Sequence, residues 1–350
     1  MSKVFFKKIT YEELLKQPDA IVDGLKISGI TENFKKDNFV GLKIHFGEKG
    51  NKSYINPNFL LPLSKFLKKT QARPFLFETN TLYRGERMNA IDHINLAYGH
   101  GFVKTNMPII IADGIKGNDY MEVKIDKKHF KTCFLAHALR DADFLLVLSH
   151  LTGHMLTGFG AAIKNLGMGC ASRRGKLAQH CQMQPVVSEK KCILCGLCIK
   201  NCPAQAIEKD NVKCFIVKEK CIGCAQCISV CPRAAIDIVW SEEYNVIGEK
   251  LAEYAYAVTR NIKCAYVNFC LYITKECDCM NKEEAGFVKD VGILFSYDPV
   301  AIDKASIDLV HKQENRDAIY DCHPKIDYLH HLQYAETLGL GSLNYELVEI

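Results

Sequence analysis

Short apolar runs alternate with helix-like stretches along most of the chain. The runs end in polar residues or glycine, which is typical of buried strands. We expect strands at 39–46, 74–78, 108–112, 144–149 and 291–295. We expect helices at 58–68, 88–98, 135–141, 250–259 and 301–311. This alternation predicts an α/β fold, in which a mostly parallel sheet is covered by helices on both faces.

A cysteine-rich repeat interrupts the pattern once. The spacing C-x2-C-x2-C-x3-C-P begins at Cys192 and recurs at Cys221. Strands and helices of the same kind resume after the second copy. We therefore expect an inserted domain at 188–240, between α/β segments at 1–187 and 241–350. The α/β part is expected to be Rossmann-like.

The repeat has the cysteine spacing that [4Fe–4S] clusters require, because three closely spaced thiolates reach one iron cube from a single loop. In two-cluster ferredoxins the fourth cysteine, before a proline, ligates the cluster of the other half. The expected ligands are Cys192, Cys195, Cys198 and Cys231 for the first cluster, and Cys221, Cys224, Cys227 and Cys202 for the second. Two structural zinc sites are the alternative, but the duplicated spacing favours clusters.

The insert is similar over its whole length to bacterial two-cluster ferredoxins, which have an α+β fold. The similarity implies low-potential one-electron transfer. Gly196 and Gly223 lie in the cluster loops, where they permit a positive φ. Since protein thiolates take every iron, the two clusters are expected to relay electrons, and substrate chemistry must occur elsewhere.

Composition and charge narrow the expected compartment and partners of the protein. The chain has 350 residues, 17 cysteines and a formal charge of +5 with no basic run of the kind that nucleic acid attracts. Its N-terminus lacks the features of a secretory leader, and it has no apolar stretch of about 18 residues. We expect a cytoplasmic protein in a reducing compartment, with neither a nucleic-acid nor a membrane partner.

Polar residues gather where the expected strands end, and in open α/β sheets ligands bind at that edge. Residues that could move protons there are His45, Glu48, Asp113, His150 and His154. Residues that could bind an anionic cofactor or a small anionic substrate are Lys43, Lys164 and Asn165. For each histidine the alternative is a structural role. For Glu48, Glu78, Asp113 and Asp298 it is capping of the following helix.

The segment 149–170 is rich in glycine and joins a strand to a helix. Free backbone N–H groups in such a loop suit a phosphate or carboxylate. The segment matches neither a Walker A loop nor a G-x-G-x-x-G motif. Tight packing of the glycines is therefore the other interpretation.

Three further cysteines are candidates for a chemical role. Cys277 and Cys279 flank an aspartate, and Cys170 precedes a short basic run at 173–176. Together they could form an extra metal site or a redox-active thiol group. The alternative is that they are isolated reduced thiols.

The chain as a whole resembles the family known as domain of unknown function 362, in its form with an inserted ferredoxin module. The matching segments are 43–48 (KIHFGE), 79–85 (TNTLYRG), 112–114 (ADG), 153–170, 277–279 (CDC) and 298–303 (DPVAID). The resemblance implies cluster binding and brings no established reaction.

Three functions fit the sequence. In the first, the clusters feed electrons to a redox reaction at the strand-end crevice. In the second, the protein is a non-enzymatic carrier that exchanges electrons with a donor or acceptor protein; it would leave the large α/β domain unexplained. The third is a metal-handling or cluster-maturation factor that uses Cys170, Cys277 and Cys279.

Overall fold

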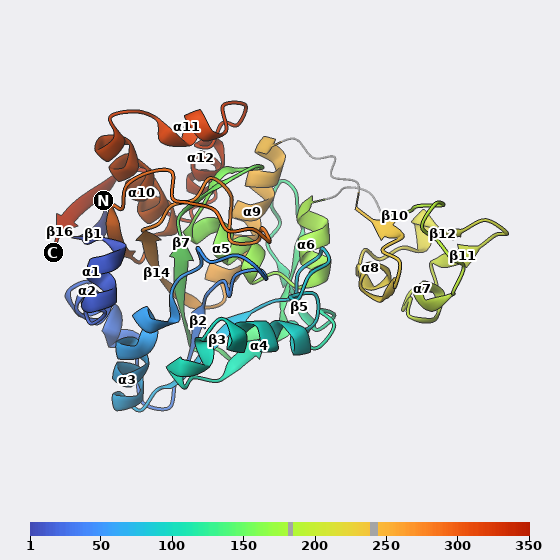
Figure 1. Cartoon of the computed structure of the whole chain (residues 1–350), viewed down its shortest axis with the longest axis horizontal. Coiled ribbons are helices and arrows are strands. Elements are labelled where there is room, and N and C mark those ends of the chain that lie inside the picture. The colour runs from blue at the N-terminus through green and yellow to red at the C-terminus, as the bar shows by residue number, and fades with distance from the viewer. Residues whose placement is uncertain (181–184, 239–243) are drawn as a thin grey trace.

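The computed structural model describes residues 1–180, 185–238 and 244–350. An eight-stranded sheet in the order β16-β1-β15-β14-β7-β2-β3-β4 forms its centre (Figure 1). The strands are β1 Ser2–Lys8, β2 Phe39–Lys43, β3 Arg73–Glu78, β4 Ile109–Ile111, β7 Phe144–His150, β14 Lys263–Cys270, β15 Gly292–Ser296 and β16 Tyr345–Glu349. Within this sheet, β15 pairs antiparallel with β1 and β14, and all other pairs are parallel. The mostly parallel sheet expected from the sequence is confirmed.

The parallel strands are doubly wound. From β4 to β14 their chain order is third, second, first, fourth and fifth, as in Rossmann-type sheets. The direction of winding reverses between β2 and β7, which pair in parallel. Ligands of such sheets bind outside the carboxyl ends of the strands at this switch point. We therefore expect a ligand site at the carboxyl ends of β2 and β7.

The larger helices cover both faces of the sheet. They are α1 Tyr11–Lys16, α2 Ala20–Ile27, α3 Leu61–Lys69, α4 Ala90–Gly99, α5 Ala162–Gly169, α6 Arg173–His180, α9 Tyr244–Thr259, α10 Pro299–Glu314, α11 Ala318–Cys322 and α12 His330–Thr337. Short 3₁₀ turns are η1 Ile30–Asn33, η2 Pro57–Leu60, η3 Phe102–Thr105 and η4 His137–Asp141. Two hairpins lie outside the sheet, β5 Tyr120–Lys124 with β6 Thr132–Ala136, and β8 Thr152–His154 with β9 Gly158–Gly160. In the described residues, no helix is both long and apolar enough to cross a membrane.

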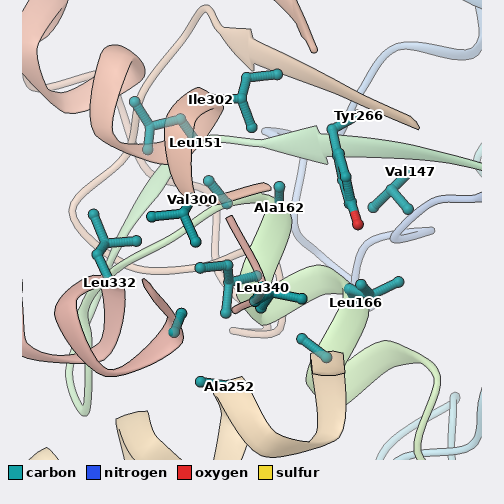
Figure 2. Packing of buried hydrophobic residues seen from close by; sticks show 14 of the residues in the cluster. Val147, Leu151, Ala162, Leu166, Ala252, Tyr266, Val300, Ile302, Leu332 and Leu340 are labelled. Atoms are coloured by element: carbon teal, nitrogen blue, oxygen red, sulfur yellow. The ribbon is translucent and has the colours of Figure 1, made fainter. Parts of the chain in front are cut away.

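Strand β7 shows how the sheet supplies two cores. Its side chains alternate between the faces. Leu145 and Val147 belong to the core that contains α5, α9 and α10, whereas Leu146 and Leu148 belong to the core that contains α2 and α3. Figure 2 shows the first core, with Val147 on the sheet side and Ala252 on α9. Helices on both faces are thus confirmed.

Most expected elements are present, with two corrections. The strand expected at 39–46 ends at Lys43, and the helix expected at 135–141 is wrong, because Leu135 and Ala136 end β6 and a 3₁₀ turn follows. Leu135 and Ala136 are buried in the first core, so an apolar strand end was mistaken for a helix start. The central strand β14 was not anticipated.

Residues 185–238 form a small separate unit, which we call the cysteine module. It contains β10 Val186–Val187, α7 Leu197–Lys200, β11 Ile207–Lys209, β12 Cys214–Ile216, η5 Lys218–Lys220, α8 Gln226–Val230 and β13 Ile236–Asp237. β10 pairs with β13, and β11 pairs with β12, both antiparallel. The module lies at one end of the molecule, beyond α6 (Figure 1). The boundary expected at 240 lies outside the described residues.

The close packing of α5 on α9 can be tested at Gly167. A Cβ at this position would come within 2.3 Å of the backbone oxygen of Leu251, so the helices would have to separate. We expect Gly167→Ala to lower the free energy of unfolding by about 1–3 kcal/mol in denaturant titrations. Gly99→Ala is the control, because nothing lies within 4 Å of its added Cβ. Equal stability of the two variants would contradict the packing.

Candidate functional site

A buried ion pair joins the ends of two central strands. Nζ of Lys43, at the end of β2, lies 2.8 Å from Oε1 of Glu78, at the end of β3, and their side chains are 1% and 5% exposed. Gly169 of α5 leaves the room that this lysine needs, since a Cβ there would lie 2.2 Å from its Cε. Asn165 Oδ1 accepts a hydrogen bond from Lys43, and its Nδ2 donates to the backbone oxygen of Leu148. Asn165 therefore bridges the switch point between β2 and β7.

Arg87 lies at the centre of the same network. Its Nε is 3.2 Å from Oε2 of Glu48, and its NH1 is 3.5 Å from Oε2 of Glu78 and 2.8 Å from Nε2 of His45. Its NH2 donates to the hydroxyl of Tyr83. Burial alone would raise the pKa of Glu78, but the neighbouring cations, Lys43 first, lower it. Glu48 and Glu78 thus pair with cations instead of capping helices.

His45 and His154 are both held neutral. Burial, with Arg87 and Lys43 nearby, holds the pKa of His45 well below its usual range. Burial and the Lys164 cation do the same to the pKa of His154, whose Nδ1 contacts Oγ1 of Thr157 at 2.8 Å. Neither ring is in its doubly protonated imidazolium form near neutral pH.

His150 is different, because it faces a carboxylate. Its Nδ1 lies 3.0 Å from Oδ2 of Asp278, and its Nε2 lies 3.0 Å from the backbone oxygen of Leu271. Both ring nitrogens thus face acceptors, which a doubly protonated imidazolium satisfies. Burial would lower the pKa of His150, but Asp278 raises it. His150 is the histidine of this set that stores a proton.

Asp113 is buried at the next strand end. The backbone N–H and Nδ2 of Asn80 donate to its Oδ1 at 2.9 and 2.8 Å, while its Oδ2 has no partner in the part of the chain described. Burial raises the pKa of Asp113 to about 6, although Lys176 opposes this. A carboxyl with such a pKa can exchange a proton near neutral pH.

Lys164 lies near the carboxylates of Asp278, Glu78 and Glu276, which act on its charge. In the described residues no hydrogen bond or ion pair reaches its Nζ. Burial lowers the pKa of Lys164 to about 8, so it is still mostly protonated at pH 7. An ammonium without a partner suits an anionic ligand. Asn165, by contrast, uses its side chain within the protein.

The chain itself fills the anion site of the glycine-rich segment. The backbone N–H groups of Ala162 and Ile163, at the start of α5, donate to the two carboxylate oxygens of Asp303 at 2.8 and 2.9 Å. Gly167 and Gly169 are in close contact with neighbouring atoms. Tight packing is therefore the interpretation that the structure supports. Asp298 caps α10, as its alternative role predicted.

The three extra cysteines do not share one chemical state. Cys277 and Cys279 are joined in a disulfide. Cys170 is buried near Lys43 and Glu78, and burial raises its pKa to about 12. In the described ranges, no group of three or more His, Cys, Asp or Glu side chains is placed to hold a single metal ion.

Sequence reasoning missed three cations of the network. Arg87 and Arg173 are fully buried, and Lys176 donates to Oγ1 of Thr79 and the backbone oxygen of Asn80, both at 2.6 Å. Arg173 and Lys176 come from α6, the basic run after Cys170. The sequence around Arg87 does not distinguish it from a surface arginine. The basic run at 173–176, by contrast, was a signal for Arg173 and Lys176.

Two cavities in the cysteine module match the expected ligand sets. The first is lined by Cys192, Cys195, Cys198 and Cys231, with Cys214 beside them. The second is lined by Cys202, Cys221, Cys224 and Cys227. Each cavity thus combines three cysteines from one half of the repeat with one from the other.

The backbone of the module repeats as its sequence does. Positive φ angles occur at equivalent positions of the two halves, namely Leu194 and Gly223, Gly196 and Ala225, and Gln205 and Ala234. The positive φ expected for both glycines is confirmed. Backbone N–H groups also point at cavity sulfurs: Ala206 donates to Cys202 and Ala235 to Cys231, at 3.2 and 3.1 Å.

The module contacts the α/β domain next to the ionic network. Leu82 and Leu177 pack into the core of the module. Arg84 donates to the backbone oxygens of Cys231 and Pro232 at 3.0 and 2.9 Å, and Asn118 donates to the side chain of Gln226. The loop after β3 thus serves both sites.

The chain belongs to the family described as Domain of unknown function (DUF362), whose model matches residues 40–308. The resemblance to this family is thereby confirmed, whereas the inserted ferredoxin module stays a prediction. No curated protein matches the chain.

Two solved structures are similar to this one. The lactate racemase apoprotein from Thermoanaerobacterium thermosaccharolyticum matches with 15% identity over 77% of this chain and 51% of its own, with a TM-score of 0.39. A protein from Thermotoga maritima matches with 10% identity over 88% of this chain and 60% of its own, with a TM-score of 0.46. The chain thus spans about half to three fifths of these two proteins.

The buried ion network can be tested at Glu78. Glu78→Gln leaves Lys43 and Arg87 without their shared anion, and we expect the free energy of unfolding to fall by about 3–5 kcal/mol. Glu86→Gln is the control, because its ion pair with Lys49 is exposed and we expect no measurable change. Denaturant titrations of both variants give the comparison. A loss in Glu86→Gln as large as that in Glu78→Gln would contradict the assignment.

A pH profile tests Asp113. Because its pKa is raised in the folded state, its contribution to stability is present below about pH 4 and is lost as pH rises through about 6. Asp113→Asn cannot ionise, so we expect the variant to gain about 2–3 kcal/mol relative to the native chain between pH 4 and 7. Denaturant titrations across this range measure the difference. A difference that is constant with pH would show that Asp113 is not perturbed.

Proposed function

We propose that this protein binds two [4Fe–4S] clusters in the cysteine module and transfers electrons through them. The observation that carries the proposal is the lining of the two cavities. Each holds the set of four cysteines that the repeat spacing assigns to one cluster. When bound, such clusters supply low-potential, one-electron transfer.

The duplicated cysteine spacing supports clusters over zinc. In each copy three closely spaced thiolates can reach one iron cube, and the cysteine before proline can ligate the cluster of the other half. The N–H groups of Ala206 and Ala235 also face sulfurs, as suits charged thiolates.

In this proposal the electrons serve a redox reaction at the strand-end network of the α/β domain. The network has four buried cations, which are Lys43, Arg87, Arg173 and Lys176. Lys164 lies beside it and has no direct hydrogen-bond or ion-pair partner in the part of the chain described, which favours a small anionic substrate. Asp113 and His150 are the groups able to exchange protons there.

Exposed apolar side chains support a partner protein at the module. Ile193, Val212 and Ile222 are 58%, 52% and 44% exposed on this small unit. Ile193 and Ile222 also line the two cavities, one each. Apolar groups at a cluster edge suit the brief docking of an electron donor or acceptor protein.

The ligand assignment can be tested by substitution. Anaerobically purified protein is expected to hold about eight irons, in two [4Fe–4S] clusters. We expect Cys231→Ser to lose about half of this iron, since it removes one ligand of one cluster. Cys214→Ser is the control, because Cys214 lines the same cavity but is outside both ligand sets. Iron analysis and electron paramagnetic resonance of the reduced protein make the measurement.

Three results would contradict the assignment. They are firmly bound zinc in place of iron, a native chain without iron, and iron loss in Cys214→Ser equal to that in Cys231→Ser.

A further inference from the structure

The disulfide between Cys277 and Cys279 has no evident structural purpose. It joins cysteines two residues apart, in the segment that follows β14. A bond that closes so short a loop removes little entropy from the unfolded chain and stabilises the fold little. Among the described cysteines, all the others are free thiols. A chemical role explains this single disulfide better than a structural one.

Its surroundings hold protons and are largely shielded from water. Asp278, between the two cysteines, is 5% exposed, and Cys277 is 6% exposed. Oδ1 of Asp278 accepts a hydrogen bond from Oγ of Ser53 at 2.7 Å, while His150 contacts its Oδ2. The protonated His150 therefore contacts Asp278, the residue between the two cysteines.

The same segment reaches the cysteine module through two consecutive residues. The hydroxyl of Tyr83 lies 3.4 Å from the backbone oxygen of Cys279. The next residue, Arg84, donates to the backbone oxygen of Cys231 at 3.0 Å. Cys231 lines the first cavity of the module. A short path of bonded and contacting groups thus joins the disulfide to a cavity wall.

We propose that Cys277 and Cys279 form a redox-active pair that is reduced by electrons arriving through the cysteine module. This inference rests on the proposed function, because the module must carry electrons. The S–S bond breaks as it takes up two electrons and two protons, and two thiols form. The electrons come singly from a low-potential reductant. One proton comes from His150 by way of Asp278, and one from water at the partly exposed Cys279.

The cysteine pair would connect one-electron transfer in the cysteine module to a two-electron reaction at the strand-end network. A cluster passes one electron at a time, whereas most substrate reductions need two. A dithiol stores two electrons until an acceptor arrives at the adjacent strand-end network. Thiol chemistry would thus connect the module to that network.

Reductive titration of the full-length, iron-loaded chain with a reduced viologen tests the proposal. We expect uptake of about four electrons per chain, two by the clusters and two by the disulfide. Differential alkylation and mass spectrometry should show both Cys277 and Cys279 as thiols after reduction only. In Cys277→Ser/Cys279→Ser the uptake should fall to about two electrons. Cys264→Ser, which replaces a free cysteine at the start of β14, should keep about four.

A chain that lacks the clusters tests the route. In Cys192→Ser/Cys221→Ser, each cluster loses one ligand, and we expect the disulfide to stay oxidised under the same viologen. Dithiothreitol should still reduce it, which shows that the bond is present and accessible.

Three results would overturn the proposal. The reduced clusters could give their paramagnetic signals while the disulfide stays intact. Both cysteines could be alkylated in the oxidised protein. The cluster-free variant could be reduced by viologen as fast as the native chain. A native chain without iron would instead overturn the proposed function, and iron analysis alone identifies that outcome.

Discussion

The ion pair between Lys43 and Glu78 constrains most of what surrounds it. A buried lysine and a buried glutamate are stable only while they neutralise each other, because removal of either leaves an unpaired charge in the interior. Their place at adjacent strand ends requires Gly169, since any side chain there would occupy the space of the lysine. It also brings in Asn165 and Arg87, which hold the remaining polar atoms. Each charge of the network thus depends on the next.

Segments that carry this network also contact the cysteine module. The loop after β3 carries Arg87 into the network and Leu82 and Arg84 onto the module. Helix α6 does the same, with Lys176 in the network and Leu177 against the module. Two segments therefore fix the module beside the strand ends. Under the proposed function, this arrangement would bring electrons to the α/β domain beside its strand-end network.

Much of this organisation was predictable from the sequence, for reasons that differ between its parts. The spacing of the cysteines is local chemistry, so it predicted the sets that line each cavity. Apolar runs ending in polar residues predicted β3, β4, β7 and β15, since buried parallel strands have a strong pattern. Strand β14 begins with a lysine and contains an asparagine, so its pattern is weaker. The error at 135–141 arose because short apolar runs fit both helix and strand.

The charges of the candidate site were harder to predict than its place. The strand ends indicated where to look, and Lys43, His45 and Glu48 do meet there. The partners of these residues come from distant segments, so spacing along the chain carries no signal for Arg87. The role of Asp303 at the start of α5 is of the same kind, because it depends on a contact between helices α5 and α10. Conversely, the pKa of His150 is raised by Asp278, a residue that sequence reasoning noted only for its cysteine neighbours.

The central claim is that the two cysteine-lined cavities hold iron–sulfur clusters. Anomalous X-ray scattering at the iron absorption edge, from crystals grown without oxygen, tests it most directly. We expect strong iron density in each of the two cavities, with every one of the eight assigned sulfurs in contact with it. Density at the zinc edge in place of iron, or cavities without iron while the chain is fully folded, would contradict the account.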